Sequence, residues 1–274
     1  MSEEQSPDFP EYDTKTTPVW DNIAGWWDDR IGDGNAFQDY LIEPSQERLL
    51  ELKPGERVLD IACGAGRFTR RMAAQGVTIL AFDHSEKFIE RAKQRTKENT
   101  GKIEYRVINA TDKAAMLELG KNEFDAAVCT MAIMDMSSIT PMISTLPELL
   151  KSNGRFVFSV AHPAFNSGTS QLIAEEKYLD GNLRSISGVK LTEYSQAFMH
   201  QGVGIPGQSE PQHYFHRSIS MLFNACFKLG FVLDGIEEPT LPEELADTRP
   251  SPLNWVKLPQ IPPVLVVRMR LFYK

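Results

Sequence analysis

A glycine turn between two apolar runs constrains the fold of this chain most strongly. Residues 57–59 are typical of a strand, the turn after them contains Gly64 and Gly66, and a helical pattern follows. A second apolar run, residues 77–82, ends in Asp83. This order of strand, glycine turn, helix and acid-tipped strand is the layout of a nucleotide-type cofactor site. The glycines let the backbone approach a ligand closely, and Asp83 is placed to accept two hydrogen bonds from a ribose diol.

Asp60, at the end of the first strand, bears on which cofactor the turn would hold. A dinucleotide would place its pyrophosphate against the helix N-terminus. A carboxylate beside two phosphates costs about 1 kcal/mol or more, even at an effective dielectric of ~20. Thr69 also stands where the third glycine of a dinucleotide fingerprint belongs. A cofactor with an ammonium and a sulfonium suits Asp60 better, and S-adenosylmethionine is such a cofactor.

Four ordered segments resemble the class I S-adenosylmethionine-dependent methyltransferases. They are VLDIACGAGRF at 58–68, AFDHS at 81–85, FDAAVC at 124–129 and GRFVFS at 154–159. The rest of the chain is similar, more loosely, to the small-molecule (methyltransferase type 11/25-like) branch of that family. The resemblance implies S-adenosylmethionine as cofactor and S-adenosylhomocysteine as product. It also implies in-line transfer of a methyl group to a small-molecule acceptor, whose nucleophile (oxygen, nitrogen or carbon) stays open.

Composition and charge narrow the possible partners and the location. A formal net charge of -8 argues against a broad nucleic-acid surface. No apolar run reaches transmembrane length, and the acidic residues 1–13 do not resemble a signal peptide. Cys63, Cys129 and Cys226 lie in apolar contexts and are expected to be reduced and buried. We therefore expect a cytoplasmic protein without a nucleic-acid or membrane partner.

Apolar runs alternate with helical patterns through the middle of the chain, which predicts an α/β fold. We expect a Rossmann-like doubly wound sheet of about seven strands, mostly parallel, with helices on both faces. The resemblance implies that the last strand is antiparallel. The predicted strands are 57–62, 77–82, 103–108, 124–130, 154–160, 231–237 and 263–272, and the predicted helices are 18–31, 44–53, 67–75, 86–98, 112–119, 139–151 and 217–228.

One structural domain with five parts is expected. Residues 163–216 show little apolar periodicity and are interpreted as an insertion on the substrate side. The other parts are a flexible N-terminus at 1–16, an N-terminal helical lid at 17–53, a cofactor-binding Rossmann-like core at 54–162 and a C-terminal completion of the sheet at 217–274.

The cofactor residues are expected at the carboxyl ends of the strands. Asp60 would attract the methionyl ammonium and Asp83 would hold the ribose, with Ser85 rather than Asp83 capping the next helix. The resemblance implies contact between the adenine and the turn after the third strand. The predicted set is Asp60, Ala62, Cys63, Gly64, Gly66, Asp83, His84, Ala110, Thr111, Thr130 and Met131.

Two histidines and a tyrosine are the candidate catalytic residues. His162 follows the fifth strand, where a neutral imidazole would take a proton from the acceptor. A structural histidine bonded to the backbone explains the same position equally well. His216 and Tyr214 are the substitutes, and no metal is predicted because no carboxylate or cysteine cluster joins His213 and His216. The predicted substrate pocket comprises Trp26, Asn35, Met134, His162, Tyr214 and Arg217.

Three other functions compete with small-molecule methyl transfer. Asp60 and Thr69 weigh against an NAD(P)-dependent oxidoreductase on a similar sheet. A non-catalytic S-adenosylmethionine-binding protein would bind the cofactor without turnover. An RNA or protein methyltransferase is disfavoured by the acidic balance, and by the absence of an Asn/Asp-Pro-Pro-aromatic sequence after the fourth strand.

Overall fold

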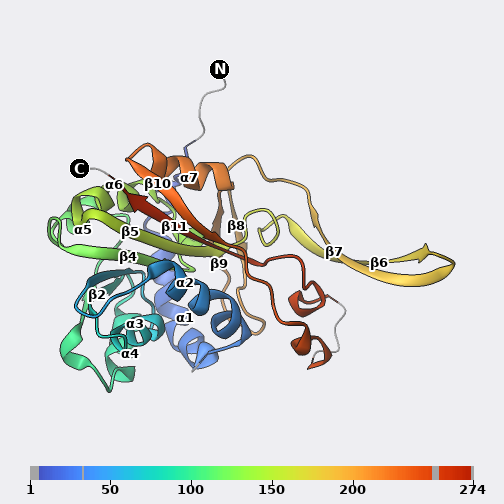
Figure 1. Ribbon diagram of the computed structural model, residues 1–274, viewed down its shortest axis with the longest axis horizontal. Helices are drawn as coiled ribbons and strands as arrows, with labels where there is room; N and C mark the ends of the chain where they lie inside the picture. The colour runs from blue at the N-terminus through green and yellow to red at the C-terminus, as the bar shows by residue number, and fades with distance from the viewer. Residues whose placement is uncertain (1–5, 33, 249–252, 273–274) are drawn as a thin grey trace.

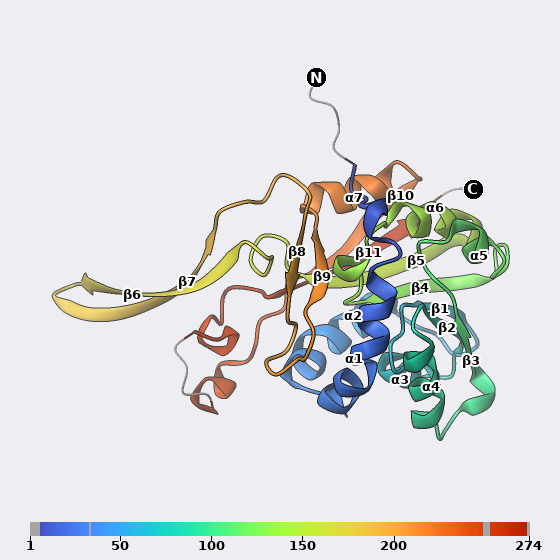
Figure 2. The ribbon, with the colours of Figure 1, turned by 180° about the vertical axis from the view of Figure 1, so that it is seen from behind.

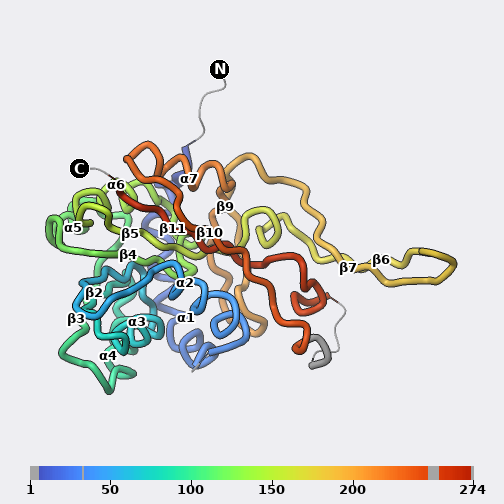
Figure 3. Tube along the Cα trace, viewed as in Figure 1, coloured from blue at the N-terminus to red at the C-terminus, as the bar shows by residue number. Residues whose placement is uncertain are grey.

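The computed structural model describes residues 6–32, 34–248 and 253–272. Figure 3 traces the chain through a central sheet with helices around it, and Figure 1 shows a long hairpin that projects from this body. The helical segments cover both faces of the sheet, as predicted. They are α1 (Thr16–Ile31), α2 (Glu43–Leu50), α3 (Arg67–Ala73), α4 (Glu86–Arg95), α5 (Lys113–Leu117), α6 (Thr140–Leu149) and α7 (Ile219–Phe227), with short turns η1 (Pro10–Tyr12), η2 (Phe37–Ile42, a π-helix), η3 (Thr100–Lys102), η4 (Ile133–Asp135), η5 (Glu243–Thr248) and η6 (Trp255–Lys257).

The central sheet has seven strands in the order β10-β11-β5-β4-β1-β2-β3. Only β11, the last strand, runs antiparallel, and it pairs with both β5 and β10. The strand order reverses between β1 and β4, so this sheet has the switch point at which doubly wound folds bind ligands. The predicted fold class is confirmed. The strands are β1 (Arg57–Ile61), β2 (Thr78–Asp83), β3 (Ile103–Val107), β4 (Phe124–Thr130), β5 (Leu150–Ala161), β10 (Phe231–Glu237) and β11 (Val264–Leu271).

Two hydrophobic cores, one on each face, fix the sheet between its helices. Leu146 of α6 and Leu222 of α7 belong to one core, and Phe68 and Met72 of α3 belong to the other. Strands β1 and β4 are almost wholly buried, as expected for parallel strands covered on both faces. Their carboxyl ends are therefore held rigidly.

The insertion, residues 163–216, contains two hairpins that the sequence pattern did not indicate. Strands β6 (Ser170–Leu179) and β7 (Asn182–Leu191) form the projecting arm, whose residues are mostly exposed on both faces. Strands β8 (Phe198–Gly202) and β9 (Gln212–His216) lie against the body beside α1 (Figure 2). Neither hairpin has one fully buried face, so neither needs the apolar alternation by which strands are predicted.

Residues 1–16 were predicted to be flexible, but residues 6–16 pack on the body of the protein. Residues 1–5 lie outside the described residues. The ring of Phe9 lies 5.3 Å from that of Phe215. The carboxylate of Asp8 accepts hydrogen bonds from the backbone amides of Ile139 and Thr140 at 2.7 and 3.1 Å. These contacts close the wall of the molecule beside β9.

The two helices of the predicted lid, residues 17–53, pack on different parts of the core. Helix α2 packs against β5, β10 and β11, whereas α1 packs on α4. Asp28 on α1 is 4% exposed and accepts hydrogen bonds from Arg91 at 2.7 Å and from Arg95 at 2.8 Å. This buried carboxylate joins the lid helix to the core.

We predict that Asp28→Asn weakens the attachment of α1. The substitution leaves two guanidinium groups with a neutral partner, which should lower the free energy of unfolding by about 1–3 kcal/mol, since both arginines are partly solvated. Urea unfolding and amide exchange along α1 would measure this. Asp29→Asn is the control, because Asp29 pairs with the same Arg91 but its side chain is 69% exposed. Equal effects of both substitutions would contradict the assignment.

Candidate cofactor and substrate site

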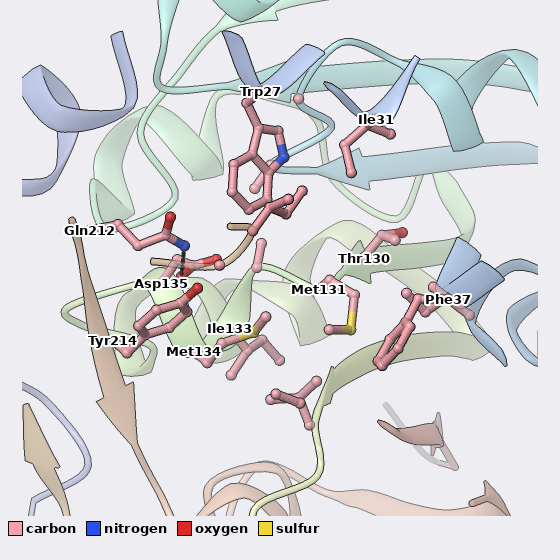
Figure 4. Close-up of a pocket in the computed structure, with 18 of the residues that line it drawn as sticks. Trp27, Ile31, Phe37, Thr130, Met131, Ile133, Met134, Asp135, Gln212 and Tyr214 are labelled. Carbon is pink, nitrogen blue, oxygen red and sulfur yellow. Dashed lines mark hydrogen bonds between the residues drawn. The ribbon is translucent and has the colours of Figure 1, made fainter. Parts of the chain in front are cut away.

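A cavity of about 1080 Å³ lies at the carboxyl ends of β1, β2, β4 and β5. Its other walls come from α1, η2, the loop between β8 and β9, and residues 241, 245 and 253–256. Figure 4 shows part of this wall, with Trp27, Phe37 and Tyr214 around the side chains that follow β4. The cavity occupies the place where the fold predicts a ligand.

The glycine turn positions one backbone amide at the floor of the cavity. Gly64 has a φ of +54°, and a Cβ there would meet nothing within 4 Å. Its amide donates to Oδ2 of Asp83 at 2.9 Å, which ties the turn to the end of β2. Gly66 does not line the cavity: a Cβ there would lie 2.5 Å from Oη of Tyr105. A side chain at Gly66 would thus clash with Tyr105, and the contact of Gly66 with the cofactor stays a prediction.

Asp60 is a buried carboxylate with one unused oxygen. Its Oδ2 accepts a hydrogen bond from Oγ1 of Thr69 at 2.5 Å, whereas Oδ1 has no partner among the described residues. Burial raises the pKa of Asp60 to about 7. An unsatisfied buried carboxylate is unfavourable, and a cation or a hydrogen-bond donor would relieve it. The site therefore fits a ligand with an ammonium group. Thr69 stands at the position of the third glycine, and its hydroxyl supplies the hydrogen bond to Asp60.

Asp83 is held for ligand binding, although it is not free of protein contacts. Ser85 caps α4 as predicted, accepting a hydrogen bond from the amide of Phe88. The two carboxylate oxygens of Asp83 accept from the amides of Gly64 and Ser85, each at 2.9 Å. Each oxygen keeps a second lone pair, and the carboxylate lines the cavity. The residues present thus fit a ribose diol at this position.

Two further turns complete the wall at the strand ends. After β3, Oδ1 of Asn109 accepts from the amide of Thr111 at 3.0 Å, and Asp112 caps α5. After β4, Nε2 of Gln46 donates to Oγ1 of Thr130 at 3.0 Å, a contact from α2 that sequence reasoning missed. The predicted cofactor residues that line the cavity are Asp60, Ala62, Cys63, Gly64, Asp83, His84, Ala110, Thr111, Thr130 and Met131.

His162 is a structural histidine, which corrects its prediction as a catalytic and pocket residue. The side chain is buried and does not line the cavity. The amide of Ala164 donates to Nδ1 at 3.2 Å, so the neutral ring carries its proton on Nε2 and donates to Glu238 at 2.8 Å. Burial lowers the pKa of His162. Both ring nitrogens are engaged, and neither is left to take a proton from a substrate.

Arg217, which was predicted to line the substrate pocket, does line the cavity, but its guanidinium group has a structural role. Its five N–H groups all point to backbone carbonyl oxygens. Burial lowers the pKa of Arg217 to about 9, and the charge of Asp8 opposes this shift only in part. The acceptors are the carbonyl oxygens of Pro7, Ile133, Met136, Ser137 and Phe215. Arg217 thus joins the N-terminal segment, η4 and β9.

Tyr214 and His216, two of the candidate catalytic residues, line the cavity. Burial and the nearby Asp135 raise the pKa of Tyr214, which keeps its hydroxyl protonated. His216 donates from Nε2 to the carbonyl oxygen of Tyr194 at 2.8 Å, which leaves Nδ1 as its acceptor nitrogen. Burial lowers the pKa of His216, so the ring is neutral near pH 7.

The tryptophans that line the cavity are not the one that was predicted, Trp26. Trp20 and Trp27 line the cavity, whereas Trp26 does not and instead lies beside Gly207. Ile31, one turn further along α1 from Trp27, lines the cavity as well. Asn35 and Met134 line the cavity as predicted. Asp135 and Gln212 also line it; a lone acid and a lone amide give no signal in a sequence.

The described ranges contain neither a candidate metal centre nor a helix that could span a membrane. No group of three or more His, Cys, Asp or Glu side chains there could hold a metal ion. No helix in those ranges is long and apolar enough to cross a membrane. Cys129 and Cys226 are buried free thiols, while Cys63 is half-buried at the cavity.

Residues 58–154 match the family described as "Methyltransferase domain". These residues are therefore similar to a methyltransferase domain, and the predicted resemblance to the class I S-adenosylmethionine-dependent methyltransferases is confirmed. S-adenosylmethionine is the cofactor expected for this family, and solved structures of this fold include complexes with S-adenosylmethionine and S-adenosylhomocysteine. The matched residues contain the whole glycine turn and the strand that ends in Asp83.

Relatives of known sequence and structure extend the comparison. An uncharacterised protein of Haemophilus influenzae is 23% identical over 86% of this chain and 89% of its own length. A ubiquinone biosynthesis O-methyltransferase of Thiobacillus denitrificans is 28% identical over 49% of this chain, and the match spans 56% of that relative. The fold is similar to that of an S-adenosylmethionine-dependent methyltransferase from Mesorhizobium loti, with a TM-score of 0.65, 22% identity, and coverage of 87% of this chain and 99% of that one.

We predict that Asp60→Asn removes a pH-dependent loss of stability. The folded pKa of about 7 lies above the ordinary 3.8, so the folded state binds this proton more tightly than the unfolded state does. The stability that Asp60 contributes is complete below about pH 4, falls as the pH rises to about 7, and is constant above that value. The Asn variant should therefore gain on the wild type across this window, by about 2–4 kcal/mol.

Urea unfolding of both proteins between pH 4 and 8.5 would measure this difference. Asp180→Asn, at the exposed turn between β6 and β7, is the control for loss of one negative charge. Parallel pH curves for Asp60→Asn and the wild type would show that Asp60 ionises normally in the folded chain.

Proposed function

We propose that this chain transfers a methyl group from S-adenosylmethionine to a small-molecule acceptor. The observation that carries the proposal is the position of the cavity. One continuous space is lined by the cofactor turn, with Asp60, Gly64 and Asp83, and by an apolar and aromatic wall beyond it. A donor and an acceptor can thus meet away from water, which is the condition that a displacement reaction requires.

The chain's own residues would hold the cofactor in the following way. Asp60 would accept a hydrogen bond from the methionyl ammonium, directly or through water, and Asp83 would accept hydrogen bonds from the ribose. Ala110 and Thr111 would contact the adenine, while Thr130 and Met131 would contact the methionine arm. When bound, S-adenosylmethionine supplies an electrophilic methyl group on a sulfonium. The weakly polar wall favours loss of that positive charge.

A small acceptor is supported by the segments that cover the cavity. Trp20 and Trp27 of α1 line one side, and the loop residues Val203, Gly204 and Ile205 line another. A folded macromolecule could not reach the strand ends without displacing these segments. The net charge of -8 also disfavours nucleic acid. We keep a cytoplasmic location as part of the proposal, in keeping with the three free cysteines.

His216 is the remaining candidate for a general base, should the acceptor lose a proton. It is neutral near pH 7, it keeps Nδ1 as an acceptor, and it lines the cavity. Tyr214 suits this role less well because its raised pKa keeps the hydroxyl protonated. Alignment and exclusion of water would supply most of the rate enhancement.

The rival functions receive less support from the same geometry. A dinucleotide would bring its phosphates toward the unsatisfied oxygen of Asp60, which would add like charge to a buried carboxylate. A non-catalytic binding protein would have the same cofactor site, and only a test for turnover distinguishes it from an enzyme. Methyl transfer to any member of an acceptor panel would exclude it.

We predict that the wild-type protein binds S-adenosylhomocysteine and S-adenosylmethionine with a Kd on the order of micromolar. Asp83→Ala should weaken both by roughly tenfold to several hundredfold, because it removes charge-assisted hydrogen bonds to the ribose. Isothermal titration calorimetry would measure the affinities. Glu98→Ala, at an exposed position beyond α4, is the control. Folded wild-type protein that bound neither ligand would overturn the proposed function.

A further inference from the structure

We propose that Asp135 holds the methyl acceptor by accepting a hydrogen bond from a hydroxyl or amine group of an otherwise apolar small molecule. This inference rests on the proposed function and names the substrate class of the same cavity. Asp135 is the last residue of η4, which follows β4, and its side chain lines the cavity. Figure 4 shows it beside Gln212 and Tyr214 of β9, with Met134 and Trp27 near by.

The carboxylate of Asp135 is held in one orientation by a chain of amides. Nε2 of Gln208 donates to Oε1 of Gln212 at 2.9 Å, so the amide nitrogen of Gln212 faces Asp135 and donates to Oδ1 at 3.2 Å. Oε1 of Gln208 accepts from the amide of Gly204 at 3.0 Å. Because every amide in this chain has a fixed direction, Oδ1 of Asp135 is already satisfied and Oδ2 is presented for another partner.

Two polar atoms at this wall have no partner among the described residues. Oδ2 of Asp135 accepts no hydrogen bond there, and Oη of Tyr214 neither donates nor accepts one. Burial raises the pKa of Asp135 well above its ordinary value. Burial thus disfavours the ionised form of Asp135, and a ligand that donates a hydrogen bond to Oδ2 would stabilise that form.

The surroundings of Asp135 define what the rest of the acceptor is. The side chains of Trp27, Ile133 and Met134 line this part of the cavity, which favours an apolar body. The nearby cation, Arg217, uses all five N–H groups on backbone carbonyls and has none to offer a carboxylate or phosphate. Beside Asp135, the wall therefore favours a hydroxyl or amine group over an anionic one.

The test compares three matched fragments, 4-propylphenol, 4-propylaniline and 4-propylanisole, of which only the first two carry a hydrogen-bond donor. Ligand-observed NMR titrations would be run with and without saturating S-adenosylhomocysteine, on wild type, Asp135→Asn and Asp135→Leu. We expect the wild type to bind the phenol and the aniline at least about fivefold more tightly than the anisole. Both variants should lose this preference, because Leu has no acceptor and Asn turns an N–H donor to the cavity.

Asp180→Asn should keep the preference, and Asp135→Asn, which retains the shape of the side chain, guards against a Leu variant that fails to fold. Binding of none of the fragments to the wild type would overturn the inference. Equal binding of the anisole, or a preference that survives in both Asp135 variants, would do so as well. Failure of S-adenosylhomocysteine to bind would count against the proposed function instead, because the titrations without it still test Asp135.

Discussion

The site depends on two carboxylates, Asp60 and Asp83, that the fold holds close together at the ends of adjacent strands. Parallel pairing of β1 with β2 brings Asp60 and Asp83 to the same edge of the sheet, where their like charges disfavour each other. Thr69, Gly64 and Ser85 donate hydrogen bonds to them, yet Oδ1 of Asp60 stays unsatisfied. The fold thus holds a negative, partly desolvated pair whose missing partner is a ligand with positive charge and hydroxyl groups.

The opposite side of the cavity depends on a buried cation. Arg217 binds five carbonyl oxygens and so fixes the N-terminal segment, η4 and the start of the chain after β9 relative to one another. Asp135 in η4 and Gln212 in β9 then meet at hydrogen-bonding distance. One buried arginine thereby shapes the wall at which we place the acceptor.

The sequence predicted the core and the cofactor turn well, because their signals are local. Buried parallel strands give continuous apolar runs, and Gly64 must adopt a positive φ. His162 and Arg217 could not be assigned in this way, since their partners, such as Glu238 and Ile133, lie far away in the chain. The rotation of α1 about its own axis, which brings Trp27 rather than Trp26 to the cavity, depends on packing against other elements. The exposed hairpins were missed because exposed strands need no alternating apolar pattern.

A crystal structure of the protein with S-adenosylhomocysteine would test the central claim most directly. We expect the ribose hydroxyls on the carboxylate of Asp83, and the amino group of the ligand within hydrogen-bonding reach of Asp60, directly or through one water. Asp83 should keep its bonds to the amides of Gly64 and Ser85 in that complex. A ligand bound elsewhere, or one whose ribose leaves Asp83 untouched while Oδ1 of Asp60 stays without a partner, would contradict the account.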